Sequence, residues 1–242
     1  MDSERAHIRA LFQGLRVTDV SDGMDIMGYQ DIGNMDHNIT PLWRDVETLE
    51  HCFIGVAHTV RFVPTNHPTI NKGPEENRQQ IADWYRELAR GPKLPIVDGD
   101  VIVIDGTDVH VGHIGSNNGW SWILQGAVGI VTNGGCRDTD EIIRQRVPVY
   151  SHHLEKPIRP FRLEWESEQT IINCGGVMVR PGDVVMADGD GVIVVPIEIA
   201  ADVARWARAV ANGDRATRRR FYEQIGRPLD ETVPPLAEEE AT

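Results

Sequence analysis

Residues 126–138 read GAVGIVTNGGCRD: an apolar run, two glycines, a cysteine, and then an arginine beside an aspartate. The run at 128–132 is typical of a buried strand, and the polar segment at 139–146 has the composition of a helix. A second short strand is expected at 147–151. Strand, helix and strand with short connections indicate an α/β fold with a mixed, partly parallel sheet. The glycines predict a turn between the first strand and the helix.

Two other segments share a pattern that predicts strands of the same sheet. GDVIVIDG at 99–106 and GDVVMADG at 182–189 both begin with glycine and aspartate and end with aspartate and glycine. In each copy the glycine permits a turn, and the first aspartate, Asp100 or Asp183, is expected to hydrogen-bond the local backbone. There is no third copy, so the pattern does not indicate a solenoid.

The remaining secondary structure follows from apolar spacing and from turn residues. Residues 29–50 and 154–176 show no clear period and are expected to be irregular. Gly213 is expected to end one helix before another begins. Further helices are expected at 3–15, 19–28, 74–90, 117–126, 197–213 and 214–225, and further strands at 52–64 and 191–196.

The composition is that of a globular protein and limits its partners. Of the 242 residues, 40% are hydrophobic and 25% charged, and no run approaches the roughly 18 apolar residues of a membrane helix. The formal net charge of −13 argues against a nucleic-acid partner, because phosphate binding needs a basic face. Three widely spaced cysteines and a polar first segment favour a cytoplasmic protein without membrane partners. We expect a single domain over 1–228 and an acidic, proline-containing tail over 229–242.

Two motifs lie where a predicted strand meets a predicted helix. GSNNG at 115–119 offers backbone N–H groups at a helix start, which favour a small anionic substrate. Arg137 can hold a carboxylate through two hydrogen bonds, and Asp138 is a hard oxygen ligand suited to Mg²⁺ or Mn²⁺. Since ligands of α/β sheets bind at the carboxyl ends of strands, the motifs are expected to face one another. Alternatively, both are structural: an Asn/Gly turn, with Asp138 capping its own helix and Arg137 pairing with a surface carboxylate.

The order of motifs from about residue 97 to residue 196 resembles the RraA-like superfamily. The matching elements are GDVIVIDG, the GS of the 115–119 loop, GAVGIVTNGGCRD, VPVYS and GGVMVRPGDVVMADGDGVIVVP. This superfamily includes class II 4-hydroxy-4-methyl-2-oxoglutarate / 4-carboxy-4-hydroxy-2-oxoadipate aldolases and the RraA proteins that regulate a ribonuclease. The resemblance implies a single compact α/β/α domain with a sheet of the swivelling-domain type. It also implies homotrimers or homohexamers with active sites between subunits.

For this chain the resemblance implies a divalent-metal-dependent lyase that cleaves a carbon–carbon bond of a small 4-hydroxy-2-oxo acid through a pyruvate enolate. Arg137 would hold the oxo acid, and Asp138 would hold Mg²⁺ or Mn²⁺ directly or through water. A metal-linked water would remove the hydroxyl proton. The substrate carboxylate would be bound by the backbone of Gly115, Ser116, Asn117 and Asn118.

The chain departs from these aldolases at positions that leave two other functions open. Ser116 stands where the aldolases commonly have an acidic residue, and Asp214 is the only acid in the segment ANGDRATRRR. His152 and His153 follow a predicted strand, and histidine acts as an acid or base near neutral pH. The first alternative is therefore a related lyase, an oxo-acid decarboxylase or dehydratase, with His152 or His153 as a catalytic residue. The second is a non-catalytic binding protein like the ribonuclease regulators.

Several reactive residue types are interpreted as structural. Cys136 has no evident base beside it in the sequence, so we expect a small packing residue. Asp188 and Asp190 lack the spacing and the closing glutamate of an EF-hand loop and are expected to form turns.

Overall fold

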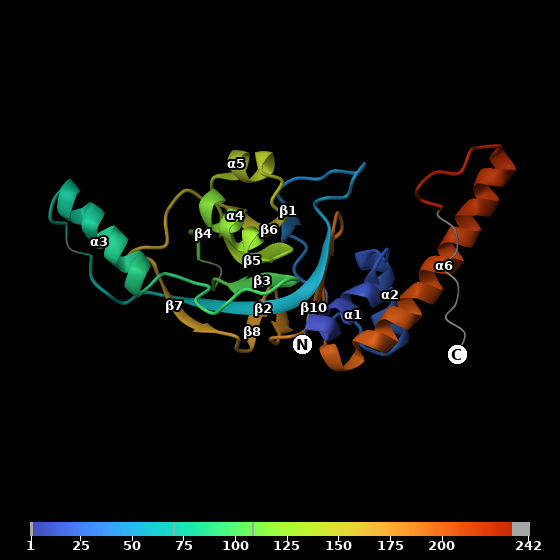
Figure 1. Ribbon diagram of the computed structural model, residues 1–242, viewed down its shortest axis with the longest axis horizontal. Helices are drawn as coiled ribbons and strands as arrows, with labels where there is room; N and C mark the ends of the chain where they lie inside the picture. The colour runs from blue at the N-terminus through green and yellow to red at the C-terminus, as the bar shows by residue number, and fades with distance from the viewer. Residues whose placement is uncertain (1, 70, 108, 234–242) are drawn as a thin grey trace.

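The computed structural model describes residues 2–69, 71–107 and 109–233. Its strands are β1 Thr40–Pro41, β2 Phe53–Pro64, β3 Asp100–Asp105, β4 Gly112–Ile114, β5 Gly129–Cys136, β6 Val149–Leu154, β7 Leu163–Glu168, β8 Ile172–Cys174, β9 Val177–Val179, β10 Val184–Asp188 and β11 Gly191–Val195. Among the described residues, nine strands form one sheet with the main order β1-β6-β5-β3-β2-β10-β11 (Figure 1). β4 pairs with β5, β7 pairs with β2, and β8 and β9 form a separate hairpin.

The centre of the sheet is parallel and its flanks are antiparallel. β2, β3, β5 and β6 run parallel to one another, whereas β10 is antiparallel to β2 and β11 to β10. The strands of the near-repeat, β3 and β10, lie on either side of β2, as expected for two strands of one sheet. This topology confirms the predicted α/β fold with a mixed, partly parallel sheet.

The helices form two groups against the sheet, and one further helix, α3, lies apart from both at one end of the molecule. α4 and α5 lie over the parallel strands, and α1, α2 and α6 pack together beside β10 and β11 (Figure 1). α3 extends from the far end of β2, away from α6 (Figure 1). The bounds are α1 Asp2–Phe12, α2 Val17–Ile26, α3 Pro74–Glu87, α4 Ser116–Leu124, α5 Thr139–Arg144 and α6 Ala200–Ile225, with a 3₁₀ turn at Ile197–Ile199.

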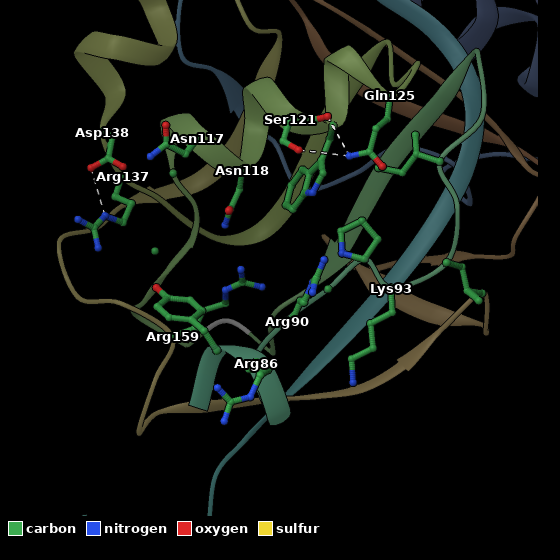
Figure 2. Close-up of a pocket in the computed structure, with 18 of the residues that line it drawn as sticks. Arg86, Arg90, Lys93, Asn117, Asn118, Ser121, Gln125, Arg137, Asp138 and Arg159 are labelled. Carbon is green, nitrogen blue, oxygen red and sulfur yellow. Dashed lines mark hydrogen bonds and ion pairs between the residues drawn. The ribbon is translucent and has the colours of Figure 1, made fainter. Parts of the chain in front are cut away.

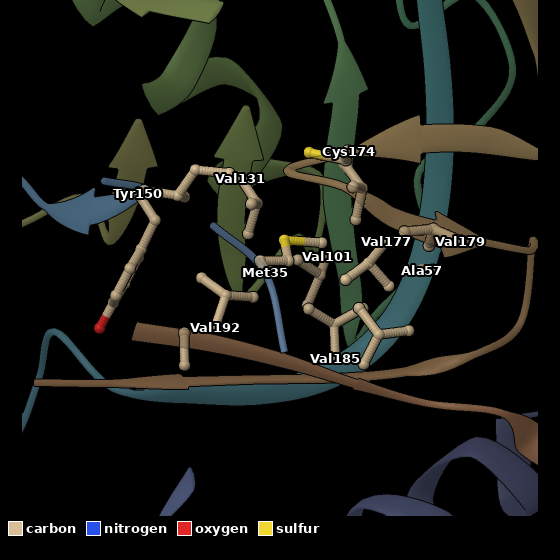
Figure 3. Close-up of a cluster of buried hydrophobic side chains, with 14 of the residues drawn as sticks. Met35, Ala57, Val101, Val131, Tyr150, Cys174, Val177, Val179, Val185 and Val192 are labelled. Carbon is tan, nitrogen blue, oxygen red and sulfur yellow. The ribbon is translucent and has the colours of Figure 1, made fainter. Parts of the chain in front are cut away.

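Alternation along the strands divides the core between the two faces of the sheet. Val101 and Val103 of β3 join an inner cluster shared by β5, β10, β11 and the β8–β9 hairpin (Figure 3). Ile102 and Ile104 join the outer cluster under α4 and α5. The strands are therefore buried on both sides, which explains why β3 reads as an unbroken apolar run.

The glycines after Thr132 do not form the predicted turn, because β5 continues to Cys136 with a shift in register between Thr132 and Gly135. The glycines instead permit close packing. A Cβ on Gly134 would lie 2.3 Å from Cδ2 of His113, and one on Gly135 would lie 2.6 Å from the carbonyl oxygen of Val111. Both positions do require glycine, but the reason is close packing and not a turn.

Gly213 does not end a helix, so the two predicted helices are one. α6 runs without a break from Ala200 to Ile225 and ends at Gly226, which takes the left-handed conformation at φ 65°. Buried Val203 and Ala211 lie on the face of α6 that packs into the core with α1 and α2. This packing outweighs the weak helix propensity of a single exposed glycine.

Segment 154–176, expected to be irregular, contains regular structure. β7 pairs antiparallel with β2, and the β8–β9 hairpin begins in the same segment. Strand β6 also extends three residues past the predicted end, through Leu154. The polar residues that hid β7 lie on a strand that pairs with β2 alone. Residues 29–50 contain only the short strand β1 and match the prediction. Of the predicted tail, residues 234–242 lie outside the described residues, and the domain limit at 228 stays a prediction.

Candidate active site

A cleft with a volume of about 1260 Å³ lies between α3, the segment after it, α4 and the end of β5 (Figure 2). It contains Arg137 and Asp138 together with residues of the 115–119 motif, so the two predicted motifs do converge. Its polar and charged lining is Tyr85, Arg86, Arg90, Lys93, Asn117, Asn118, Ser121, Gln125, Arg137, Asp138 and Arg159, and its other lining residues are Ala82, Gly91, Pro92, Leu94, Pro95, Ile96, Gly112, Gly115 and Trp122.

Asp138 joins β5 to α5 and turns its carboxylate away from its own helix. Its backbone is in the left-handed region at φ 56°, and its side chain makes no cap hydrogen bond to α5. Instead, Oδ2 accepts a 3.3 Å hydrogen bond from the backbone N–H of Ser116, and Oδ1 accepts one of 3.2 Å from Nε of Arg137. Asp138 therefore occupies the N-cap position of α5, but its side chain does not cap that helix, and its carboxylate is held at the start of α4.

Two glycines make room for this pair. A Cβ on Gly115 would lie 2.7 Å from Oδ2 of Asp138, and one on Gly112 would lie 2.8 Å from the side-chain carbons of Arg137. Both distances are too short for a real contact. The glycine of the 115–119 motif thus brings Asp138 close to the N-terminus of α4, where the helix dipole favours a negative charge.

The first turn of α4 keeps part of its capacity to bind an anion. The N–H of Ser116 is bonded to Asp138, but those of Asn117 and Asn118 belong to a first turn that has no preceding carbonyls to bond. Both asparagines line the cleft (Figure 2). Ser116 also donates its hydroxyl to Oε2 of Glu141 at 2.6 Å. Sequence reasoning missed Glu141, although it lies one turn after Asp138 in the helix that follows.

The histidines are not among the described residues that line the cleft. His152 and His153 lie on β6, and the ring of His153 lies 4.1 Å from that of His152 and 4.5 Å from that of His110. His110 contacts Glu155 at 2.8 Å through Nδ1. His113 is fully buried, and burial together with the charge of Arg159 lowers its pKa to about 3. The neutral ring of His113 therefore serves packing and not proton transfer at pH 7.

Cys136 and the aspartates of the second repeat have the structural roles that we expected. Cys136 is buried, and this burial raises the pKa of its thiol to about 12, which suits packing and not nucleophilic attack. Asp183 accepts hydrogen bonds from the N–H groups of Arg180 and Ile197. Asp188 accepts one from the N–H of Asp190, which closes a turn.

The charge of the cleft is strongly positive, a feature that sequence reasoning missed. Its described lining holds one carboxylate, that of Asp138, against the cations of Arg86, Arg90, Lys93, Arg137 and Arg159. Arg86 is balanced locally by Asp83 and Glu87. The positive side chains come from α3, from the segment after it and from the β6–β7 connection. Only the fold brings these regions to Arg137, so local sequence patterns could not reveal them.

A buried histidine fixes the segment that forms one wall of the cleft. His58 on β2 has no exposed surface and contacts Asp100 at 3.2 Å through Nδ1 and Glu168 at 2.6 Å through Nε2. Glu168 accepts hydrogen bonds from the backbone N–H groups of Lys93 and Leu94 at 2.6 and 3.0 Å. Asp100, expected only to bond its local backbone, does so through Val97 but also contacts His58 and Arg5.

The side chains suit a weakly held hard cation and not a closed metal cage. Among the described residues there is no group of three or more His, Cys, Asp or Glu side chains that could hold a metal ion. Mg²⁺ is commonly bound by one or two carboxylates while waters and substrate complete its shell. Asp138 in the cleft, with Glu141 reaching the same serine, fits such a water-rich site.

The family model for the RraA-like family, described as Aldolase/RraA, matches residues 17–194. The chain belongs to the RraA-like family. The match begins with α2 and runs through the sheet to β11, so it includes both motifs of the cleft. No helix among the described residues is long and apolar enough to cross a membrane.

Similar proteins match over parts of their length. The Arabidopsis thaliana protein named "Putative 4-hydroxy-4-methyl-2-oxoglutarate aldolase 3" is 31% identical over 111 residues, which are 43% of this chain and 62% of that protein. A Halalkalibacterium halodurans protein of the same name, without the number, is 29% identical over 171 residues, 66% of this chain and 80% of that protein. An uncharacterized Methanocaldococcus jannaschii protein is 29% identical over 98 residues, 40% of this chain and 47% of its own length. The chain thus spans less than two thirds of the first and third of these relatives.

Solved structures share the fold across nearly the whole chain. An uncharacterized protein of Pseudomonas syringae superposes with a TM-score of 0.69 at 23% identity, covering 95% of this chain and 98% of that one. RraAS2 of Streptomyces coelicolor, described as an unusual member of the RNase ES inhibitor RraA protein family, superposes with a TM-score of 0.60 at 19% identity, covering 91% and 95%. At these identities the likeness shows the fold alone.

Proposed function

We propose that this protein is a divalent-metal-dependent lyase that cleaves the C3–C4 bond of a small 4-hydroxy-2-oxo acid and releases pyruvate. The observation that carries the proposal is the convergence of Arg137, Asp138 and the first turn of α4 on one positively charged cleft. Relatives named as aldolases of this type support the substrate class. A docking surface for another protein would not require a carboxylate held beside an arginine inside a cleft.

Each group of the chain has a role in the proposed reaction. The N–H groups of Asn117 and Asn118 bind the substrate carboxylate, and Arg137 bonds the 2-oxo oxygen. When the bond breaks, its electron pair moves to that oxygen as the enolate of pyruvate forms, and the positive guanidinium stabilises it. The hydroxyl proton passes to a water beside the carboxylate of Asp138 as C4 becomes a carbonyl, and a proton returned to C3 of the enolate gives pyruvate. Among the described lining residues the carboxylate of Asp138 is the one acidic group near this centre.

Asp138, with Glu141 beside it, would hold Mg²⁺ or Mn²⁺ largely through water, and the ion would add positive charge to the oxygens of the oxo acid. The alternative lyase that uses His152 or His153 lacks support from the cleft, because neither residue is among its described lining. We therefore place the catalytic roles on Arg137 and Asp138.

The test measures pyruvate release from a panel of 4-hydroxy-2-oxo acids with Mg²⁺, with Mn²⁺ and with a chelator. We expect metal-dependent turnover that falls at least about 100-fold in the Asp138→Asn variant, because the amide has no charge to hold the ion. Asp140→Asn is the matched control, since Asp140 is exposed, lies on α5 and does not line the cleft. Its activity should be unchanged.

Two results would count against the proposal. Turnover that does not depend on a metal and survives Asp138→Asn would exclude the assigned mechanism. No turnover of any oxo acid, combined with Mn²⁺ binding equal in the wild type and the Asp138→Asn variant, would favour the non-catalytic alternative.

A further inference from the structure

Tyr85 brings a phenol hydroxyl into the cleft, beside its charged residues. It lies on α3, is half-buried and belongs to the cleft lining. The guanidinium carbon of Arg159 lies 5.8 Å from the centroid of its ring. Burial raises the pKa of the phenol; the charges of Arg159 and Arg137 act against this rise, and that of Asp138 adds to it. Since such interactions weaken with distance, the phenol lies near the pair of residues that we assign to the reaction.

The fold itself does not use the hydroxyl of Tyr85. The hydroxyl of Tyr150 donates a 3.1 Å hydrogen bond to the carbonyl oxygen of His51. That of Tyr222 donates one of 3.0 Å to the carboxylate of Asp230. Within the described ranges of the chain, the hydroxyl of Tyr85 forms no such bond, and only burial and nearby charges act on it. A hydroxyl that lies in a cleft without a protein partner is available to a ligand.

The neighbours of Tyr85 fix α3 to strand β7. Trp84 is buried and donates from its indole N–H to the carbonyl oxygen of Leu163 at 3.1 Å. Leu88, at the C-cap of α3, accepts a 2.6 Å hydrogen bond from the backbone N–H of Trp165. These contacts lie on both sides of Tyr85 along the helix. They hold its backbone in place, as a catalytic group requires, because small misplacements reduce rates strongly.

The proposed reaction needs a proton donor that neither Arg137 nor Asp138 supplies. After the carbon–carbon bond has broken, C3 of the enolate must gain a proton to become the methyl group of pyruvate. A carboxylate that holds a metal ion is ionised and has no proton to give, and a guanidinium does not lose its proton in proteins. A phenol is a far stronger acid than the methyl group of a ketone, so its proton passes to C3 readily. Tyrosine is one of the side chains that act as general acids.

We propose that Tyr85 is a catalytic residue that donates its hydroxyl proton to C3 of the pyruvate enolate. This inference rests on the proposed function and adds the group that completes the reaction. The O–H bond breaks, and the electron pair of the enolate double bond forms the C3–H bond while the C2 carbonyl is restored. The phenolate then regains a proton from water, which balances the proton that the substrate hydroxyl released to water. The charge of Arg159 beside the ring favours this short-lived phenolate.

Exchange of carbon-bound hydrogen tests Tyr85 separately from bond cleavage. In D₂O with Mg²⁺, the wild type should replace the C3 hydrogens of pyruvate with deuterium, because the same group removes a proton in the reverse step, and NMR measures the rate. In 2-oxobutyrate, C3 carries two hydrogens, and a donor fixed on one face should exchange one of them selectively. We expect Tyr85→Phe to slow the exchange at least about 100-fold, as is usual for the loss of a general acid, and to abolish the selectivity.

Phenylalanine isolates the hydroxyl, because it keeps the ring against Arg159 and breaks no hydrogen bond that the described residues form. The melting temperature of Tyr85→Phe and its affinity for pyruvate, measured by calorimetry, should therefore equal those of the wild type. Tyr29→Phe is the matched control, since Tyr29 is exposed and does not line the cleft. It should leave the rate and the selectivity of exchange unchanged.

The outcomes separate this inference from the proposed function. Exchange by Tyr85→Phe at the wild-type rate and with the wild-type selectivity would overturn the role of Tyr85 but not the lyase proposal. Slower exchange with the selectivity kept, together with a lower melting temperature or weaker pyruvate binding, would make Tyr85 a structural residue and also overturn the inference. If the wild type shows selective exchange that depends on Tyr85 but cleaves no oxo acid, the role of Tyr85 stands and the lyase proposal fails. Neither exchange nor cleavage by the wild type would overturn both.

Discussion

At the scale of single residues, the conformation of Asp138 carries most of the argument for a site. A left-handed backbone is disfavoured for residues other than glycine, although aspartate tolerates it better than most. Here it aims a carboxylate at the start of a neighbouring helix instead of its own. The 32% exposure of the Arg137 side chain and the 34% exposure of Asp138 leave both accessible to a ligand.

Gly115 provides a test of this placement. We expect Gly115→Ala to reduce kcat/KM at least about tenfold, because the new Cβ would lie 2.7 Å from Oδ2 of Asp138 and would displace the carboxylate. The backbone of Gly115 is extended at φ −128°, so alanine introduces no conformational strain there. Pyruvate-release kinetics measure the effect, and thermal unfolding should show a stability close to that of the wild type.

Gly213→Ala is the control for the same chemical change. It lies in α6 with nothing within 4 Å of the added Cβ, and alanine favours helix by about 0.5–1 kcal/mol. It should raise stability and leave kcat/KM unchanged. Full activity in Gly115→Ala would show that the placement of Asp138 does not matter to the reaction.

Local patterns could predict part of this site but not all of it. Arg137, Asp138 and residues 115–118 were predictable, because both motifs follow adjacent strands whose carboxyl ends meet at one edge of the sheet. Arg159 gave no local signal: it lies between two prolines in a polar segment, and only tertiary packing buries it. His152 and His153 are not among the described lining of the cleft and lie on β6, which runs on past its predicted end, so their catalytic role stays a prediction.

At the scale of elements, local sequence patterns likewise predicted some strands and helices correctly and others wrongly. The unbroken apolar run of β3 and the apolar period of α3 predicted these elements well, because each pattern reports directly on buried residues. The glycines of β5 and α6 led to wrong predictions of a turn and of a helix end. Glycine permits a turn, but it also permits close packing, as in β5, and it is tolerated inside a helix that tertiary packing stabilises, as in α6. A single sequence does not separate these causes.

The His58 network links β2 and β7 to the segment at 93–97 and should make stability depend on pH. Burial alone would lower the pKa of His58, but hydrogen bonds to Asp100 and Glu168 outweigh it and raise the pKa to about 9. The ordinary value is 6.5, so the protonated ring contributes its full stability below about pH 6.5. That contribution is lost as the pH rises through about 9.

The acids of this network titrate in the opposite sense. The pKa values of Asp100 and Glu168 are lowered by His58 and by backbone N–H groups despite burial, so their contribution is lost only as the pH falls through acid values. The free energy of unfolding, measured with urea, should therefore decline between about pH 6.5 and about pH 9. Deprotonation of His58 should lower it by at most about 1.4 kcal/mol per pH unit. Arg5 also forms an ion pair with Asp100.

His58→Gln is the comparison, because glutamine can donate to one carboxylate but does not titrate. Its stability should be lower than that of the wild type near neutral pH and should change less over the same range. Where the variant does not fold, an NMR titration of the His58 ring in the wild type gives the answer directly. A ring that deprotonates near pH 6.5 would contradict the charged network.

At the scale of the whole molecule, two opposing fields act on an anionic substrate. The chain carries a formal net charge of −13, which repels anions at long range, whereas the described lining of the cleft places five cations against one carboxylate at short range. The screening length is about 10 Å at 0.1 M salt. Within the cleft the charges lie closer to a bound substrate than the acids spread over the surface do, so we expect the local attraction to dominate binding.

Salt dependence of KM tests which field dominates. Raising NaCl from about 0.02 M to about 0.5 M should raise KM several-fold, because salt screens the contacts between the substrate carboxylates and the cations of the cleft. The rise should be steeper for a substrate with two carboxylates than for one with a single carboxylate, and kcat should change little. The neutral osmolyte sucrose at matched osmolality is the control. A KM that falls with salt would mean that repulsion by the whole molecule outweighs the cleft, and the positive lining would then not be the basis of substrate selection.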